Sequence, residues 1–187
     1  MKNAKFILKL AAILFAIVFV CTLLLVLAND LTKGRIAELK LEAENTAKLE
    51  VLPDASSFDL AEAQGVAEAY IGKDADGNTV GYCFKSETSG FGGVITMMVG
   101  VKKDGTLSGV RITNLSETPG LGAKATDFDW ISQFDGKSDT ISVVKTGNAK
   151  GNEINAISGA TITSKAVAEG VNDALEAAKT LMEKEGE

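Results

Sequence analysis

Histidine is absent from this chain of 187 residues, and cysteine is scarce. Without an imidazole no Ser-His-Asp triad can form, and the commonest general base and metal ligand of proteins is missing. Cys21 lies in an apolar run and Cys83 far beyond it, so we expect two packed thiols rather than a disulfide or a metal site. Any redox chemistry would therefore need a bound cofactor.

Basic residues are fewer than acidic residues. The 19 Lys and Arg residues face 25 Asp and Glu residues, which gives a formal net charge of −6. No basic stripe is visible, so nucleic acid is not an expected partner. The length fits one domain of ordinary size with an appendage.

One long apolar run stands near the N-terminus, after a tail over residues 1–9. Leu10–Ala28 is a stretch of 19 residues without a charge. At about 1.5 Å per residue it nearly crosses a hydrocarbon core of about 30 Å, and it shows no polar face. We expect a transmembrane anchor over 10–28. The alternative is a signal peptide cleaved after Val26-Leu27-Ala28, although the run is longer than a usual signal-peptide core.

The charges beside the anchor leave its orientation open. Three basic residues precede the run and three follow it closely, so the positive-inside rule does not decide. The simpler arrangement has the short tail inside and the large domain outside the cytoplasm. The basic residues are Lys2, Lys5 and Lys9, then Lys33, Arg35 and Lys40.

The remaining chain divides into a stalk and a domain. Residues 29–53 are rich in Ala, Leu, Lys and Glu and predict a helical stalk that Pro53 ends. We place the domain at 54–187. Its first part, 54–66, predicts a connection with room for a short helical turn.

The domain pattern predicts an α+β fold, with an antiparallel sheet and a C-terminal helix. Asp76-Gly77 and Asp104-Gly105 are favoured hairpin sequences between the runs. The run over 94–101 is apolar on both faces, which indicates a central strand. Apolar periodicity after Thr163 predicts an amphipathic helix, capped by the hydroxyl of Thr163 or Ser164. The expected strands cover 80–85, 94–101, 107–115 and 141–145, and the expected helices cover 130–134 and 164–184.

Two segments have the residue types of a binding site. Ser158–Ser164 holds four hydroxyl residues in seven and opens onto the final helix. Taken alone it fits a capped helix start, but free N–H groups and the helix dipole there would also favour a phosphate, with Lys165 adding positive charge. Glu117–Gly122 fits a plain loop, or a loop whose glycines let backbone N–H groups reach a flat ring while Leu121 covers its face. Gly90–Gly93 predicts a turn.

These segments spell SGAT at Ser158–Thr161 and ETPGLG at Glu117–Gly122. SGAT shortly before a C-terminal helix, with ETPGLG upstream and an N-terminal anchor, resembles the FMN-binding domain of the G subunits of Rnf electron-transport complexes. Those proteins are related to the C subunits of the sodium-translocating NADH:quinone oxidoreductases. The similarity extends over nearly the whole chain.

The resemblance implies FMN joined through its phosphate to Thr161 by a separate flavin transferase. Such a transferase fits the absence of an in-chain base, because the hydroxyl can be activated in trans. The family pattern has an aspartate three residues before the serine of SGAT, where this chain has Asn155. The expected cofactor-binding residues are Thr161 (covalent), Ser158, Gly159, Ala160, Thr163, Lys165, Glu117, Thr118, Gly120, Leu121 and Gly122.

The resemblance also implies a function and partners. The chain would be the electron-transfer subunit of a membrane-bound, ion-translocating oxidoreductase complex of the Rnf type, carrying electrons on its FMN and not catalytic alone. Its partners would be the other membrane subunits and the flavin transferase. An alternative is a membrane-tethered binding or sensory module that holds flavin non-covalently. A self-contained reductase is least supported, because the chain has no room for a second catalytic domain.

Overall fold

The computed structural model describes residues 2–145 and 147–185. These residues divide into two compact units at the boundary between Glu42 and Ala43. The first unit is the N-terminal part of one long helix, α1 (Lys2–Val51), whose last turns belong to the second unit. Among the described residues, this is the helix that is long and apolar enough to cross a membrane. The predicted N-terminal apolar helix is therefore confirmed, and it continues through the expected stalk without a break.

The second unit is built on an antiparallel sheet in which each strand pairs with the next, in the order β1-β2-β3-β4-β5. The Asp-Gly pairs lie in the hairpins as predicted, and Gly77 and Gly105 have the positive φ that these turns require. The strands are β1 (Ser57–Ala61), β2 (Glu68–Lys73), β3 (Thr79–Ser89), β4 (Val94–Lys102) and β5 (Leu107–Asn114).

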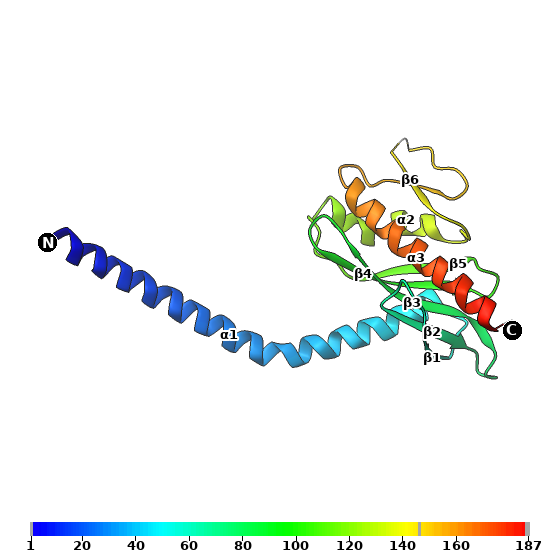
Figure 1. The fold of residues 1–187 in the computed structure, drawn as a ribbon, viewed down its shortest axis with the longest axis horizontal. Coiled ribbons are helices and arrows are strands. Elements are labelled where there is room, and N and C mark those ends of the chain that lie inside the picture. The colour runs from blue at the N-terminus through cyan, green and yellow to red at the C-terminus, as the bar shows by residue number, and fades with distance from the viewer. Residues whose placement is uncertain (1, 146, 186–187) are drawn as a thin grey trace. The chain divides into compact units, whose positions relative to one another are not determined.

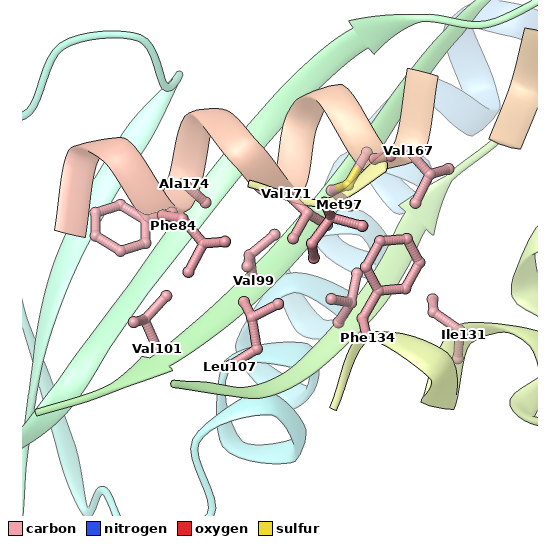
Figure 2. Close-up of a cluster of buried hydrophobic side chains, with 14 of the residues drawn as sticks. Phe84, Met97, Val99, Val101, Leu107, Ile131, Phe134, Val167, Val171 and Ala174 are labelled. Atoms are coloured by element: carbon pink, nitrogen blue, oxygen red, sulfur yellow. The ribbon is translucent and has the colours of Figure 1, made fainter. Parts of the chain in front are cut away.

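The helix α3 (Thr161–Glu185) crosses one face of this sheet (Figure 1). Figure 2 shows the core between them, where Phe84, Val99 and Leu107 of the sheet meet Val167 and Val171 of α3. These side chains are almost fully buried. Their burial is the main force that holds α3 on the sheet.

Shorter elements close the end of this core. The predicted helix around Trp130 is confirmed: Trp130, Ile131 and Phe134 are buried against the sheet. The strand predicted at 141–145 is present as β6, and it pairs in parallel with β7, which was not predicted. The elements are η1 (Gly122–Thr126), α2 (Phe128–Ile131), η2 (Ser132–Phe134), β6 (Ser142–Val144) and β7 (Glu153–Asn155).

The other face of the sheet receives the last turns of α1. Ala47 and Val51 pack there with Cys83 of β3 and Met98 of β4. This explains why β4 is apolar on both faces: Met97 faces the α3 core and Met98 faces α1. Burial raises the pKa of the Cys83 thiol to about 12. The sheet is thus the middle layer of three.

Glycines on neighbouring strands make this second contact close. A β-carbon on Gly100 would lie 2.1 Å from the carbonyl oxygen of Val51, and one on Gly72 would lie 2.4 Å from Cδ2 of Leu52. Gly81 of β3 also faces Leu52, at 2.9 Å. The Ser108 hydroxyl donates a hydrogen bond to the Val51 carbonyl. We call Gly72, Gly81, Gly100 and Gly109 the glycine band.

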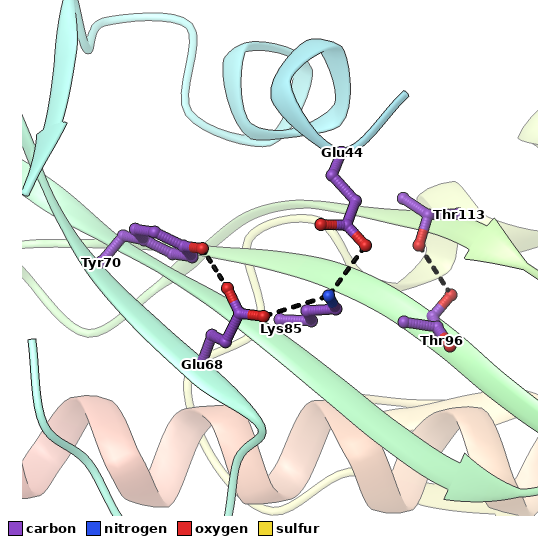
Figure 3. A network of polar contacts seen from close by, with 6 residues as sticks. All are labelled: Glu44, Glu68, Tyr70, Lys85, Thr96 and Thr113. Carbon is purple, nitrogen blue, oxygen red and sulfur yellow. Dashed lines mark hydrogen bonds and ion pairs between the residues drawn. The ribbon is translucent and has the colours of Figure 1, made fainter. Parts of the chain in front are cut away.

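Ion pairs and a cation–π contact also join the end of α1 to the sheet (Figure 3). Lys85 of β3 forms ion pairs with Glu44 of α1 at 2.8 Å and with Glu68 of β2 at 3.1 Å. Burial lowers the pKa of Lys85, but the two carboxylates outweigh it and hold that pKa above its ordinary value. The Lys48 ammonium lies 3.5 Å from the centre of the Tyr70 ring, a cation–π contact.

Two predictions for this unit were wrong. Residues 57–61 form the edge strand β1 and not a connection or a helical turn. An edge strand exposes most of its side chains, as β1 does, and therefore lacks the apolar alternation that predicts a strand. The final helix begins at Thr161 and not at Ser164.

The glycine band makes a prediction about stability. Gly100→Ala should lower the free energy of unfolding by about 1–3 kcal/mol, because the added carbon meets a backbone oxygen that cannot rotate away. Gly109→Ala is the matched control, since Gly109 pairs with Gly100 and its β-carbon would lie 3.5 Å from Val51, an ordinary contact. Urea unfolding of the full chain in detergent, followed by the fluorescence of Trp130, would measure both. Equal effects at the two positions would contradict the close contact at Gly100.

Candidate functional site

The candidate site is a cleft of about 390 Å³ at the start of α3. Three segments that are distant in sequence line it: the turn between β3 and β4, the loop after β5, and the first turn of α3. The lining residues are Phe91, Glu117, Thr118, Leu121, Gly122, Gly159, Ala160, Thr161, Ile162 and Thr163.

The first turn of α3 offers unpaired backbone N–H groups. Among the described residues, the N–H groups of Thr161, Ile162 and Thr163 have no hydrogen-bond partner, whereas that of Ser164 donates to the Ala160 carbonyl at 3.0 Å. Ala160 precedes the helix and has no side-chain oxygen to cap it. Unpaired N–H groups and the positive end of the helix dipole make this turn an anion-binding position.

The cap predicted from Thr163 or Ser164 is absent, because both residues lie inside the helix. The Ser164 hydroxyl instead accepts a hydrogen bond from the Ile157 N–H at 2.9 Å and donates one to the Ala160 carbonyl at 2.9 Å. Ser164 is fully buried. It therefore fixes the loop that leads into the helix and leaves the first N–H groups without a side-chain cap.

Asn155, at the end of β7, makes three hydrogen bonds to neighbouring segments. Its side-chain oxygen accepts a hydrogen bond from the Ala149 N–H at 3.1 Å, and its carbonyl accepts one from the Trp130 indole at 2.8 Å. Its own N–H donates to the side-chain oxygen of Gln133 at 2.8 Å. The backbone of Asn155 thus joins β7 to the helix around Trp130, and its side chain joins β7 to the segment between β6 and β7.

The loop after β5 begins with a tight turn. The Leu121 N–H donates to the Thr118 carbonyl at 3.1 Å. The two residues between them are Pro119 and Gly120, and Gly120 has a φ of +77°. Proline followed by a glycine of positive φ is typical of a type II turn. A β-carbon on Gly120 would meet nothing within 4 Å, so this glycine is required by its φ and not by a close contact.

Leu121 connects the two loops of the cleft. Its side chain lies 3.1 Å from the position of a β-carbon on Gly159, which also has a positive φ of +77°. Gly159 therefore allows both the turn and the approach of Leu121. The Leu121 N–H donates inside its own loop, so it is not among the N–H groups that this loop can offer to a ligand.

The two threonines at the start of α3 differ in access. Both line the cleft, but Thr161 is half-buried whereas Thr163 is only 1% exposed. Three of the predicted residues do not line the cleft, namely Ser158, Lys165 and Gly120. Two lining residues escaped prediction, Phe91 and Ile162. The glycines around Phe91 indicated a turn, and nothing in the sequence indicated what the turn would pack against.

A larger cleft of about 930 Å³ lies between the β1–β2 connection and the C-terminal half of α3. Its lining includes Glu62, Glu68, Asp173 and Glu176. Burial raises the pKa of Asp173, and the neighbouring Glu169 and Glu176 raise it further. This acidic cleft is a poor position for a phosphate, so the smaller cleft is the better candidate. The described residues hold no group of His, Cys, Asp and Glu side chains that could bind a metal ion.

Ser164 allows a test of how the attachment loop is held. Ser164→Ala should lower the free energy of unfolding by about 1–3 kcal/mol, because the buried Ile157 N–H loses its acceptor. Urea unfolding would measure the loss, and hydrogen exchange at the Ile157 amide would locate it. Ser158→Ala is the control, because Ser158 is exposed and should change stability by less than about 0.5 kcal/mol. An unchanged Ile157 amide would contradict this role.

Comparisons with known proteins agree with this geometry. Residues 90–176 match the model of the FMN-binding domain, a range that spans all three segments of the cleft. Two solved structures share the fold. The first is NqrC of Shewanella oneidensis, with a TM-score of 0.56 and 22% identity; the match covers 74% of this chain and 72% of that chain. The second is the C subunit of the Na(+)-translocating NADH-quinone reductase of Parabacteroides distasonis, with a TM-score of 0.60 and 19% identity; the match covers 79% of this chain and 96% of that chain.

The similarity in sequence is higher for two other proteins. The G subunit of the Na(+)-translocating ferredoxin:NAD(+) oxidoreductase complex of Acetobacterium woodii is 40% identical over 95% of this chain and 94% of its own length. The G subunit of the ion-translocating oxidoreductase complex of Methanosarcina acetivorans is 32% identical over 94% of this chain and 96% of its own length. The chain therefore belongs to the FMN-binding-domain family, among the G subunits of ion-translocating oxidoreductase complexes.

Proposed function

We propose that this chain is the electron-carrying subunit of a membrane-bound, ion-translocating oxidoreductase complex, and that it holds FMN by a phosphoester to Thr161. The observation that carries the proposal is the cleft, which joins unpaired N–H groups at a helix start to apolar walls. FMN has the matching chemistry, a phosphate at one end and a flat ring at the other. When bound, it supplies the redox chemistry that the side chains of this chain lack.

The phosphate end of the cofactor fits the first turn of α3. The N–H groups of Thr161, Ile162 and Thr163 can donate to phosphate oxygens, and the helix dipole favours their charge. Gly159 lets the backbone come close to the ligand. Lys165 is exposed one turn further along and adds positive charge at this end of the helix.

Access favours Thr161 over Thr163 as the point of attachment. Thr161 is the first residue of the helix and half-buried, so its hydroxyl can be reached. Thr163 is only 1% exposed beneath it. The bond would join the Thr161 oxygen to the FMN phosphorus, with FAD as the donor: the pyrophosphate bond of FAD breaks, AMP leaves, and the transferase takes up the hydroxyl proton. The chain has no histidine to remove the hydroxyl proton, which supports attachment by a separate flavin transferase.

The ring end fits the apolar part of the cleft. Leu121 and Ile162 line it and are 45% and 57% exposed, so a flat ring placed there would cover apolar surface that now faces solvent. The chain's part in electron transfer is then to position the ring, limit its contact with water and dock to other membrane subunits. The names of the relatives support such subunits as partners, and α1 supports a place in the membrane.

Covalent attachment can be tested by removing one hydroxyl at a time. Thr161→Val should abolish in-gel flavin fluorescence after SDS denaturation, together with the added FMN mass of the intact protein, when the chain is co-expressed with a flavin transferase. Thr163→Val is the matched control and should keep both signals, because the Thr163 side chain is only 1% exposed. Release of all flavin from the wild-type protein on denaturation would favour the alternative, a module that holds flavin non-covalently. Peptide mapping that finds FMN on Thr163 would place the attachment site there instead of at Thr161.

The side of the membrane can be tested with protease. We propose that the domain after the anchor lies outside the cytoplasm, with the N-terminal tail inside. Protease added to intact spheroplasts should then degrade the domain and leave a small membrane fragment, while a cytoplasmic marker protein stays intact. Full protection of the domain, with degradation only after lysis, would show the opposite orientation.

A further inference from the structure

We propose that Glu117 is a positioning residue whose carboxylate clamps the β3–β4 turn over the cleft and so makes Phe91 a wall against the flavin ring. This inference rests on the proposed function for the identity of the ring, but the clamp itself is a property of the chain without cofactor. It gives Glu117 a different task from direct contact with the cofactor and adds Phe91 to the site.

The clamp consists of two hydrogen bonds to one carboxylate oxygen. Oε1 of Glu117 accepts from the Phe91 N–H at 2.7 Å and from the Gly92 N–H at 3.2 Å. The turn itself is closed by the Gly90 N–H, which donates to the Gly93 carbonyl at 2.8 Å. Hydrogen bonds to an ionised acceptor are about twice as strong as neutral ones. The Glu117 side chain therefore joins the loop after β5 to the turn before β4.

Two glycines make room for this carboxylate, and a third makes room for the backbone beside it. A β-carbon on Gly90 would lie 2.3 Å from Oε1 of Glu117, and one on Gly122 would lie 2.6 Å from Oε2. A β-carbon on Gly92 would lie 2.2 Å from the Ser116 carbonyl oxygen. None of these glycines has a positive φ, so backbone conformation does not require them. Close approach of the turn to Glu117 and Ser116 explains Gly90 and Gly92, and the Glu117 side chain folded against its own loop explains Gly122.

The clamp fixes the Phe91 backbone while the ring stays open to solvent. Phe91 lines the cleft, yet its side chain is 72% exposed. The Phe91 N–H is hydrogen-bonded to Glu117, so the backbone that carries the ring is held at the edge of the cleft. Ile162 lines the same cleft. Aromatic rings gain free energy when they pack on another ring. A flat ring in the cleft would give the exposed ring of Phe91 that contact.

The first arm of the test measures the clamp in flavin-free full-length protein in detergent. Glu117→Ala should speed hydrogen exchange at the Phe91 and Gly92 amides by about tenfold, because both lose a charged acceptor. Glu117→Gln is the matched control, because its side-chain oxygen can still accept, and its change should be smaller than about threefold. Phe91→Ala should leave both amides protected. Unchanged exchange in Glu117→Ala would overturn the clamp.

The second arm measures the wall in flavin-loaded protein by iodide quenching of flavin fluorescence. Phe91→Ala and Glu117→Ala should each raise the quenching constant about twofold, and the double variant should raise it no further, because both changes act through one ring. Wild-type quenching in Phe91→Ala would overturn the wall. If the wild-type chain holds no flavin, the proposed function fails, whereas the first arm still decides the clamp. Trp130 fluorescence checks that each variant is folded.

Discussion

The contact between the end of α1 and the glycine band determines how the sheet can be used. The Val51 carbonyl oxygen lies so close to Gly100 that the β-carbon of any other residue there would be only 2.1 Å from it. A helix end this close buries one face of the sheet, so β4 is covered on both sides, by α1 and by α3. The sheet becomes a rigid middle layer, and the site is built from loops at its border. Loops held by a rigid layer are suited to placing ligand groups.

Much of the fold could be predicted because its signals are local. A strand buried on both faces reads as a continuous apolar run, which is why 94–101 indicated β4. The Asp-Gly pairs marked two hairpins by their turn chemistry. The strand β1 had no such signal, since an edge strand with exposed side chains resembles a loop. The start of α3 was placed too late because the hydroxyls of Thr163 and Ser164 suggested a cap, whereas Ser164 bonds to the loop before the helix.

The candidate site was predictable only in part. Thr161 and Leu121 followed from motifs and from the resemblance that these motifs carry. Phe91 did not, because its place in the cleft depends on a hydrogen bond to a residue 26 positions away. Sequence shows that glycines surround Phe91, but it does not show what they make room for. The same holds for the glycine band, whose members are scattered along four strands and have a common purpose only once the strands are paired.

The glycine band also determines where second-site suppression is possible. Glycine is the smallest residue, so a substitution at one of the tight positions of the band, Gly72, Gly81 or Gly100, adds at least one carbon, and relief must come from the opposing group. Opposite Gly72 that group is the Leu52 side chain, which a second substitution can shorten. Opposite Gly100 it is the Val51 carbonyl, and no exchange of side chains removes a backbone atom. A genetic screen should thus find partners that restore a Gly72 variant among substitutions of Leu52. At Gly100 a substitution of Ser108, whose Oγ would lie 2.6 Å from the added carbon, would still leave the Val51 oxygen in place.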